Sequence, residues 1–223
     1  MITLQDITIQ SGAFRLANVS LSLARGEYVA LMGKTGQGKT TIIEAICGLR
    51  TVTCGMIQID GQDVTHLPPA QRGVGYVPQD LALFPTMTVR ENLAFALRIR
   101  RKPQAVDELA GWLGIAPLLD RRVAMLSGGE AQRTALGRAL SFEPKVLLLD
   151  EPFSALDDET RNEMHRLMRE VRQRTGVTVL HITHNRSEAE ALADRVITIE
   201  GGKVLSAQFS GLSSEIGTPN TSN

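Results

Sequence analysis

The sequence is poor in several features that define whole classes of proteins. Its 223 residues contain two cysteines, and Lys plus Arg equal Asp plus Glu at 24 each, so the formal net charge is zero. A neutral chain lacks the basic footprint of generic nucleic-acid binding. The longest unbroken apolar runs, at 28–32 and 93–97, are far shorter than the roughly 20 apolar residues that a membrane span needs. These absences predict a chain that neither crosses a bilayer nor binds nucleic acid.

The cysteines and the N-terminal residues also lack the patterns of metal sites, disulfide frameworks and secretory signals. Cys47 and Cys54 lack a C-x-x-C spacing, which disfavours a zinc site and a disulfide framework. We interpret them as reduced thiols, the alternative being an oxidation-sensitive thiol near the glycine-rich loop described below. Residues 1–10 contain no basic segment followed by an apolar one, so no secretory signal is expected. The chain is predicted to be soluble and intracellular.

What is present is the composition of an ordinary globular domain, with 43% hydrophobic and 22% charged residues. Apolar strand patterns alternate with helical ones, which predicts an α/β fold with a mostly parallel sheet. An alternating segment at 2–9 is predicted as an edge-type strand, and a helical stretch at about 80–140 interrupts the sheet. We predict one domain over 1–205, closed by a hairpin around Gly201-Gly202, and a disordered tail over 206–223.

Several helices carry local signals. A helix is expected over 41–49 with Gly48 near its end, and another begins at Thr88, which forms a capping box with Glu91. Its predicted face holds Val89, Leu93, Leu97 and Arg98. Pro103 is expected to open a further helix.

A longer helix is indicated by an apolar stripe. Met164, Leu167, Met168 and Val171 recur at helical spacing and predict a core-facing side. The interleaved arginines are interpreted as a solvated face; they are Arg161, Arg166, Arg169, Arg172 and Arg174.

The segment GKTGQGKT matches the phosphate-loop pattern G-x-x-x-x-G-K-Ser/Thr between an apolar strand and a helix. Glycines allow backbone N–H groups to turn towards phosphates, and the helix N-terminus adds a positive dipole. A lysine supplies charge for the β- and γ-phosphates, and a hydroxyl can ligate Mg²⁺. The predicted nucleotide-binding residues are Gly33, Lys34, Thr35, Gly36, Gln37, Gly38, Lys39, Thr40 and Thr41.

A second apolar strand, VLLLDEP, ends in two acids. Asp150 is placed to hold Mg²⁺ together with Thr40, and Glu151 to act on the attacking water. Phosphoryl transfer depends on positioning and charge neutralisation, so these two carboxylates with the phosphate loop form a sufficient set.

Further motifs occur in a characteristic order: GYVPQD, LSGGEAQR, SALD directly after the acids, and LHITHN. The set resembles the ATP-binding subunit of ABC transporters over about residues 1–205. The resemblance implies a phosphate-loop NTPase core, an N-terminal antiparallel β-subdomain and an inserted helical subdomain.

The resemblance also assigns roles. It places Phe14 on the adenine, where the alternative is a core aromatic, and gives Gln79 a contact to Mg²⁺ or the lytic water. His184 corresponds to the switch histidine beside the γ-phosphate, although Asn185 replaces the common Asp after it. Three residues that open a helix, Ser127, Gly128 and Gly129, together with Asp157, are expected to face ATP bound to a second copy.

The implied function is an ATPase that uses ATP and Mg²⁺ to power a separate membrane permease from the cytoplasmic face of the plasma membrane. The segment 83–93 resembles importers, and 12–23 is similar to molybdate- and sulfate-type importers, whose solute-binding protein would be an indirect partner. Many such importers carry a C-terminal regulatory barrel, which is not expected after residue 207.

Two alternatives stay open. An ABC-type ATPase could serve a soluble scaffold or a DNA-processing complex, although the absence of a basic patch disfavours DNA. A GTPase or small-molecule kinase shares only the phosphate loop, and the sequence contains no Asn-Lys-x-Asp motif that would read guanine.

Overall fold

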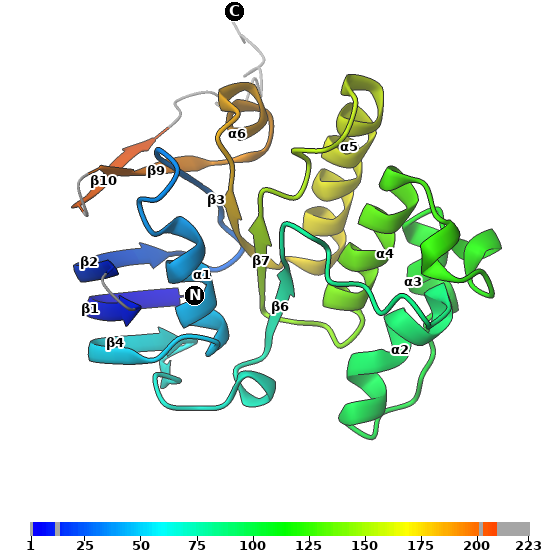
Figure 1. Ribbon diagram of the computed structural model, residues 1–223, viewed down its shortest axis with the longest axis horizontal. Helices are drawn as coiled ribbons and strands as arrows, with labels where there is room; N and C mark the ends of the chain where they lie inside the picture. The colour runs from blue at the N-terminus through cyan, green and yellow to red at the C-terminus, as the bar shows by residue number, and fades with distance from the viewer. Residues whose placement is uncertain (1, 12–13, 201–202, 209–223) are drawn as a thin grey trace, which may run out of the picture.

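A computed structural model describes residues 2–11, 14–200 and 203–208. Two sheets are arranged side by side with helices packed around them (Figure 1). The first sheet is antiparallel in the order β2-β1-β4-β5, and the second has the order β10-β9-β3-β8-β7-β6, parallel except for β10. The predicted α/β class, with an antiparallel N-terminal sheet and a mostly parallel main sheet, is confirmed.

The antiparallel sheet contains β1 (Ile2–Ser11), β2 (Phe14–Leu23), β4 (Val52–Ile59) and β5 (Gln62–Asp63). The prediction of an edge-type strand at 2–9 was wrong, because β1 pairs with β2 on one side and β4 on the other. Alternation reports that one face of a strand is buried, and it does not report how many neighbours the strand has. Asp60-Gly61 turns the chain between β4 and β5, with Asp60 at φ 51° and Gly61 at φ 78°.

The main sheet contains β3 (Tyr28–Met32), β6 (Val74–Val77), β7 (Val146–Asp150), β8 (Thr178–Ile182), β9 (Arg195–Glu200) and β10 (Lys203–Gln208). β10 extends into the predicted tail. The predicted turn at 201–202 and the rest of that tail, 209–223, lie outside the described residues.

The helices are α1 (Lys39–Cys47), α2 (Val89–Ile99), α3 (Asp107–Trp112), α4 (Gly128–Leu140), α5 (Asp158–Thr175) and α6 (Arg186–Leu192). Short 3₁₀ turns occupy Pro69–Gln71, Ala116–Leu118 and Val123–Met125. None of the described helices is long and apolar enough to cross a membrane.

The helix ends test the local signals. The Thr88–Glu91 capping box is present on α2, and Gly48 ends α1 in the left-handed conformation. Arg98, however, is exposed and does not share the buried face of α2. The helix predicted from Pro103 begins only at Asp107, because a proline fits a first turn without requiring one.

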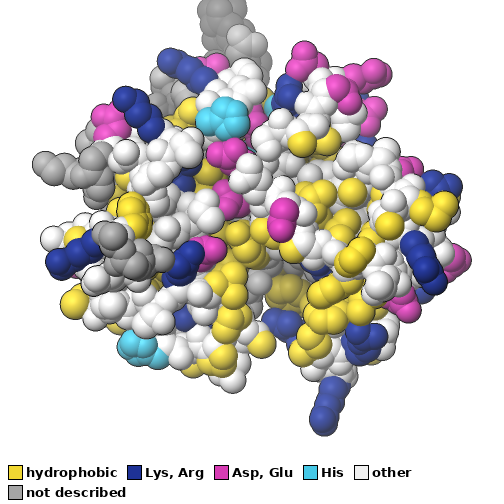
Figure 2. Space-filling model, viewed as in Figure 1, with side chains coloured by type: hydrophobic (Ala, Val, Ile, Leu, Met, Phe, Trp, Pro, Cys, Tyr) yellow, Lys and Arg dark blue, Asp and Glu magenta, His cyan; other side chains and the backbone are white. Residues whose placement is uncertain are grey.

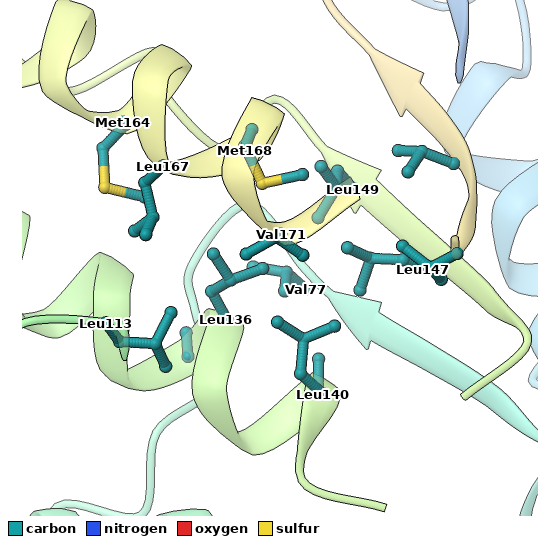
Figure 3. Packing of buried hydrophobic residues seen from close by; sticks show 14 of the residues in the cluster. Val77, Leu113, Leu136, Leu140, Leu147, Leu149, Met164, Leu167, Met168 and Val171 are labelled. Atoms are coloured by element: carbon teal, nitrogen blue, oxygen red, sulfur yellow. The ribbon is translucent and has the colours of Figure 1, made fainter. Parts of the chain in front are cut away.

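Two hydrophobic cores lie on opposite faces of the main sheet. Val29 and Leu31 of β3 point towards α1 and the antiparallel sheet, whereas Tyr28 and Ala30 point towards the helices α2–α5. The core between the main sheet and the helices α2–α5 contains the predicted apolar stripe of α5 (Figure 3). All four residues of that stripe are buried. The residues labelled in Figure 3 come from β6, β7, α4 and α5, together with Leu113, which directly follows α3.

One predicted solvated arginine is instead structural. Arg172 Nη1 donates to Asp194 Oδ1 at 3.0 Å, and its Nε donates to the Gly26 carbonyl at 3.1 Å. The charge pattern of α5 alone could not reveal this pair, since Asp194 lies far along the sequence.

The two cysteines are free, with Cys47 buried and Cys54 exposed. Burial raises the pKa of Cys47 to about 12, so the thiol near the phosphate loop stays protonated at neutral pH.

Candidate functional site

The parallel strands bring the predicted site residues to one edge of the main sheet. β3 leads into the phosphate loop, β6 ends just before Gln79, β7 ends in Asp150, and β8 ends two residues before His184. Because β3, β8, β7 and β6 are adjacent and parallel, their carboxyl ends lie together. Residues spread over some 150 positions therefore meet at one site.

The phosphate loop is shaped by three glycines. Gly36 and Gly38 have φ values of 82° and 88°, in the left-handed region that favours glycine. Gly33 is required for another reason: a Cβ there would lie 2.6 Å from the Ile199 carbonyl oxygen of β9. No side chain caps the first turn of α1, so the N–H groups at its start face the loop without a side-chain acceptor.

Lys39 closes this loop from within. Lys39 is only 7% exposed, and its Nζ donates to the carbonyls of Gly33 at 2.8 Å and Lys34 at 3.1 Å. These two carbonyls hold the ammonium group at the centre of the cradle. The arrangement suits the phosphates of a nucleotide.

The acid pair lies beside the cradle. Asp150 is 3% exposed, and burial raises its pKa, while a hydrogen bond from Thr40 opposes the rise. Oxygen ligands from a hydroxyl and one or two carboxylates, completed by phosphates, are the set that Mg²⁺ prefers. The residues present fit that ion, because a divalent cation would compensate the buried carboxylate. The described residues contain no group of three or more His, Cys, Asp or Glu that could hold a metal ion by itself.

Glu151 is held in a strained conformation at the strand end. Its φ is 47°, and its N–H donates to the Ile182 carbonyl of β8 at 3.0 Å. The carboxylate oxygen Oε2 lies 3.3 Å from His184 Nδ1. The structure thus joins the predicted base and the predicted switch histidine.

Nine of the predicted residues line one cleft of about 390 Å³, namely Phe14, Thr35, Gly36, Gly38, Lys39, Thr40, Thr41, Gln79 and Glu151. Phe14 is 37% exposed there and packs on Gly38, where a Cβ would meet its ring at 3.0 Å. The interpretation of Phe14 as a core aromatic is therefore wrong, and its expected stacking on a base stays a prediction.

Ser127, Gly128, Gly129 and Asp157 are not part of that cleft. They line a separate depression of about 370 Å³ at the start of α4 and α5. Ser127 caps α4, with a capping box to Glu130, and Asp157 caps α5 by accepting from Thr160 N–H at 2.9 Å. The predicted ATP-binding residues therefore fall into two separate groups on the surface, for which we use the term half-sites.

A buried polar network, which the sequence did not predict, lies next to the segment carrying His184. Tyr28 Oη lies 2.9 Å from His181 Nδ1, and His181 Nε2 lies 2.8 Å from Glu188 Oε1, although not in good hydrogen-bond geometry. Thr183 Oγ1 donates to Glu188 at 3.1 Å and accepts from Asn185 N–H at 3.0 Å, which ties both neighbours of His184 to the core.

Glu188 stays charged in this setting. Burial would raise its pKa, but the adjacent His181 and a hydrogen bond from Thr183 lower it overall. The available signal in the sequence was His181, a histidine within β8. It is buried, and its contacts with Tyr28 and Glu188 link it to the segment that carries His184.

Comparison with known proteins identifies the family. The ABC transporter family profile matches residues 16–154, more than half of the chain. The chain belongs to the ABC transporter family. A molybdate/tungstate import ATP-binding protein of Archaeoglobus fulgidus is 46% identical over 197 residues, covering 87% of this chain and 81% of the relative.

Other relatives are longer. A molybdate/tungstate import ATP-binding protein of Thermococcus kodakarensis is 42% identical, covering 92% of this chain but 64% of the relative. A sulfate/thiosulfate import ATP-binding protein of Nocardia farcinica is 40% identical, with 98% and 65% covered. This ABC chain therefore spans less than two thirds of the length of these two relatives.

Solved structures of ABC cassettes share the fold. A dimeric ATP-binding cassette in a post-hydrolysis state, bound to ADP and Pi, superimposes with a TM-score of 0.82 at 29% identity, covering 95% of this chain and 100% of that one. The ADP conformation of another ATP-binding cassette gives 0.82 at 25% identity, with 93% and 91% covered.

Proposed function

We propose that this ABC protein binds and hydrolyses ATP and that it powers solute import through a separate membrane permease. The single observation that carries the proposal is the cleft in which Lys39, Thr40, Gln79 and Glu151 converge beside buried Asp150. The import ATP-binding relatives favour a permease over a soluble scaffold. Family membership also argues against the GTPase and kinase alternatives.

In this mechanism, the N–H groups of the phosphate loop and Lys39 bind the phosphates, and Phe14 lies where it can stack on the base. Asp150 and Thr40 would hold Mg²⁺, whose chemistry is to neutralise charge on the β- and γ-phosphates. Glu151 takes a proton from the attacking water, and Gln79 orients that water. His184, paired with Glu151, lies beside the reacting phosphate.

The second half-site indicates how two copies would cooperate. Ser127 and the N-terminus of α4 offer N–H groups and a positive dipole without any lysine of their own. We propose that they bind the γ-phosphate of ATP held by a second copy, which gives a symmetric dimer with two ATP molecules. The dimeric form of the solved cassette bound to ADP and Pi supports this arrangement.

The permease is proposed to dock on the part of the protein formed by α2, α3 and α4. Figure 2 shows hydrophobic side chains gathered over the region of α2 and α4. Ile99 and Met125 are 58% and 70% exposed. Such surface exposure is typical of an interaction site. Docking there would place the protein at the cytoplasmic face of the plasma membrane.

The cargo is proposed to be chosen by the permease and its solute-binding protein. Relatives named for molybdate/tungstate, sulfate/thiosulfate and spermidine/putrescine are 40–46% identical to this chain, although those solutes differ in charge and size. An ATP-binding chain that is so similar across these solutes does not itself select them.

Replacing Glu151 by Gln tests the proposal. The variant should bind ATP with unchanged affinity, form an ATP-dependent dimer, and lose about 10²- to 10⁴-fold in turnover. Phosphate release and light scattering with ATP measure the two effects. Glu170→Gln, an exposed carboxylate on α5, is the matched control and should behave as the wild type. Turnover near wild type in Glu151→Gln would overturn the assignment of the base.

A further inference from the structure

The loop between β6 and α2 contains an unusual pair of residues. Leu81 and Ala82 are consecutive and have φ values of 61° and 43°. The left-handed region is unfavourable for residues with a Cβ, so the surrounding structure must hold this pair in place. The pair follows Gln79 directly: Leu81 N–H donates to the Pro78 carbonyl at 3.0 Å, which closes a turn around Gln79 and Asp80.

Arg138 of α4 holds both left-handed residues by their backbones. Its Nη2 donates to the Leu81 carbonyl at 2.8 Å, and its Nη1 donates to the Ala82 carbonyl. Its guanidinium carbon also lies 5.5 Å from the centre of the Phe84 ring. A planar fork with fixed donors can bind two adjacent carbonyls at once, which a lysine cannot. Burial lowers the pKa of Arg138, and the nearby Asp80 opposes that shift.

The approach of α4 to this loop is built into the core. A Cβ on Gly75 of β6 would lie 2.5 Å from the Ala139 carbonyl oxygen, so only glycine permits this packing. Asn92 of α2 fixes the far end of the loop, with Phe84 N–H donating to its Oδ1 at 2.9 Å. Asn92 itself is fully buried. The loop that carries Gln79 is therefore fastened at two points, and Arg138 is the one nearer the cleft.

The same helix begins at the second half-site. Ser127 caps α4, and Arg138 lies eleven positions along, roughly 16 Å down a continuous helix. A helix of this length moves as one body, so a displacement at its N-terminus reaches the Gln79 loop through the arginine fork.

We propose that Arg138 is a positioning residue that couples the α4 half-site to Gln79. When a phosphate from the second copy pulls on the start of α4, Arg138 transmits the movement to the turn that presents Gln79 to water and Mg²⁺. The inference rests on the proposed ATPase function and assigns a role to a residue that does not line the cleft.

Substitution at Arg138 tests this role. Arg138→Met should lower kcat for ATP at least tenfold while KM changes less than twofold, because the phosphate loop is untouched. The Mg²⁺ concentration for half-maximal activity should rise severalfold, since Gln79 is no longer held. Arg138→Lys keeps the charge and the stem but cannot span two carbonyls, so it should show the same pattern to a smaller degree and covers the case in which the Met variant fails to fold.

Arg100 supplies the matched control. It also lies over a phenyl ring, 4.1 Å from the centre of Phe142, and donates to one backbone carbonyl, that of Ala70, at 3.0 Å. Arg100→Met and Arg100→Lys should change kcat and the Mg²⁺ dependence less than twofold. Equal behaviour of the Arg138 and Arg100 variants would overturn the inference. So would a loss in Arg138→Met that matches a lower number of ATP-binding sites per chain, which would indicate a structural defect.

A second variant tests the left-handed pair. Glycine adopts positive φ without steric cost, so Ala82→Gly in the Arg138→Met background should recover kcat at least threefold. No recovery would overturn the role of the pair. If the wild-type protein fails to hydrolyse ATP, the proposed function and this inference fall together. If it hydrolyses ATP and the Arg138 variants match the wild type, the inference alone falls.

Discussion

The two half-sites of this ABC protein are built by different means. The cleft at the end of the main sheet places charged groups in the interior, with Lys39 and Asp150 almost fully buried and Glu151 strained at positive φ. The depression at the start of α4 uses exposed helix caps and carries no buried charge among its lining residues.

The difference indicates how each half-site performs its role. Buried charges need long-range partners from several strands, so the cleft is assembled by the whole fold, and we propose that one chain supplies all of its phosphate contacts there. A helix N-terminus is assembled locally by its cap, and it can only add donors to a phosphate held elsewhere. Changes in the first should abolish nucleotide binding, and changes in the second should spare it.

The largest effect is expected from Lys39→Ala. This change removes the charge at the centre of the cradle, so ATP affinity should fall about 100-fold or more, equivalent to roughly 3 kcal/mol. Isothermal titration with ATP measures it. Lys102→Ala removes an exposed lysine that does not line the cleft, and this variant should bind ATP normally. Equal affinity in the two variants would remove the distinction between the half-sites.

Ser127→Ala should have a smaller and different effect. The side chain no longer accepts from Glu130 N–H, so α4 loses a cap worth about 1 kcal/mol, and ATP-dependent dimerisation weakens while ATP affinity of the monomer is unchanged. Sedimentation with ATP and thermal unfolding provide the measurements.

Thr88→Ala is the matched control, because Thr88 forms the same capping box on α2 away from both half-sites. It should cost a similar stability without affecting dimerisation. A weaker dimer in both variants would show that Ser127 acts through stability alone.

The smallest effect is expected from Asp60→Asn. Asp60 follows β4 of the antiparallel sheet and forms an ion pair with Lys145, which precedes β7 of the main sheet. A hydrogen bond from Lys145 lowers the pKa of Asp60 to about 2. The stabilisation is present above pH 4 and is lost as the pH falls towards 2. Solvent screening limits it to roughly 0.5–1 kcal/mol. The variant should be less stable at pH 7 and show a shallower loss between pH 4 and 2 in thermal unfolding.

Asp120→Asn removes a carboxylate whose side chain is 93% exposed and should leave that acid branch unchanged. If Asp60→Asn shows the wild-type dependence of thermal stability on pH, the ion pair between Asp60 and Lys145 contributes nothing to the stability of the protein.

Local patterns predicted much of the fold and most of the cleft. The capping box of α2, the glycine at the end of α1 and the buried stripe of α5 are properties of short segments. The phosphate loop and the acid pair were found because their chemistry needs particular residues at short spacing. The start of α3 was predicted too early because a proline fits a first turn without requiring one. The edge position expected for β1 and the solvated state expected for Arg172 were wrong because both depend on neighbours far along the chain.

The sequence by itself determined which chemistry this ABC protein can carry, since the phosphate loop, the acid pair and the LSGG segment are each contiguous. Only the tertiary structure decided which of them act together. Parallel strands brought Gln79, Glu151 and His184 to one edge, whereas α4 carried Ser127 to a separate depression. Only the structure placed Arg138 beneath the loop of Gln79, because the contact joins two backbone carbonyls to a side chain more than fifty positions away. Every residue has a backbone carbonyl, so no pattern of side chains in the sequence could predict this contact of Arg138.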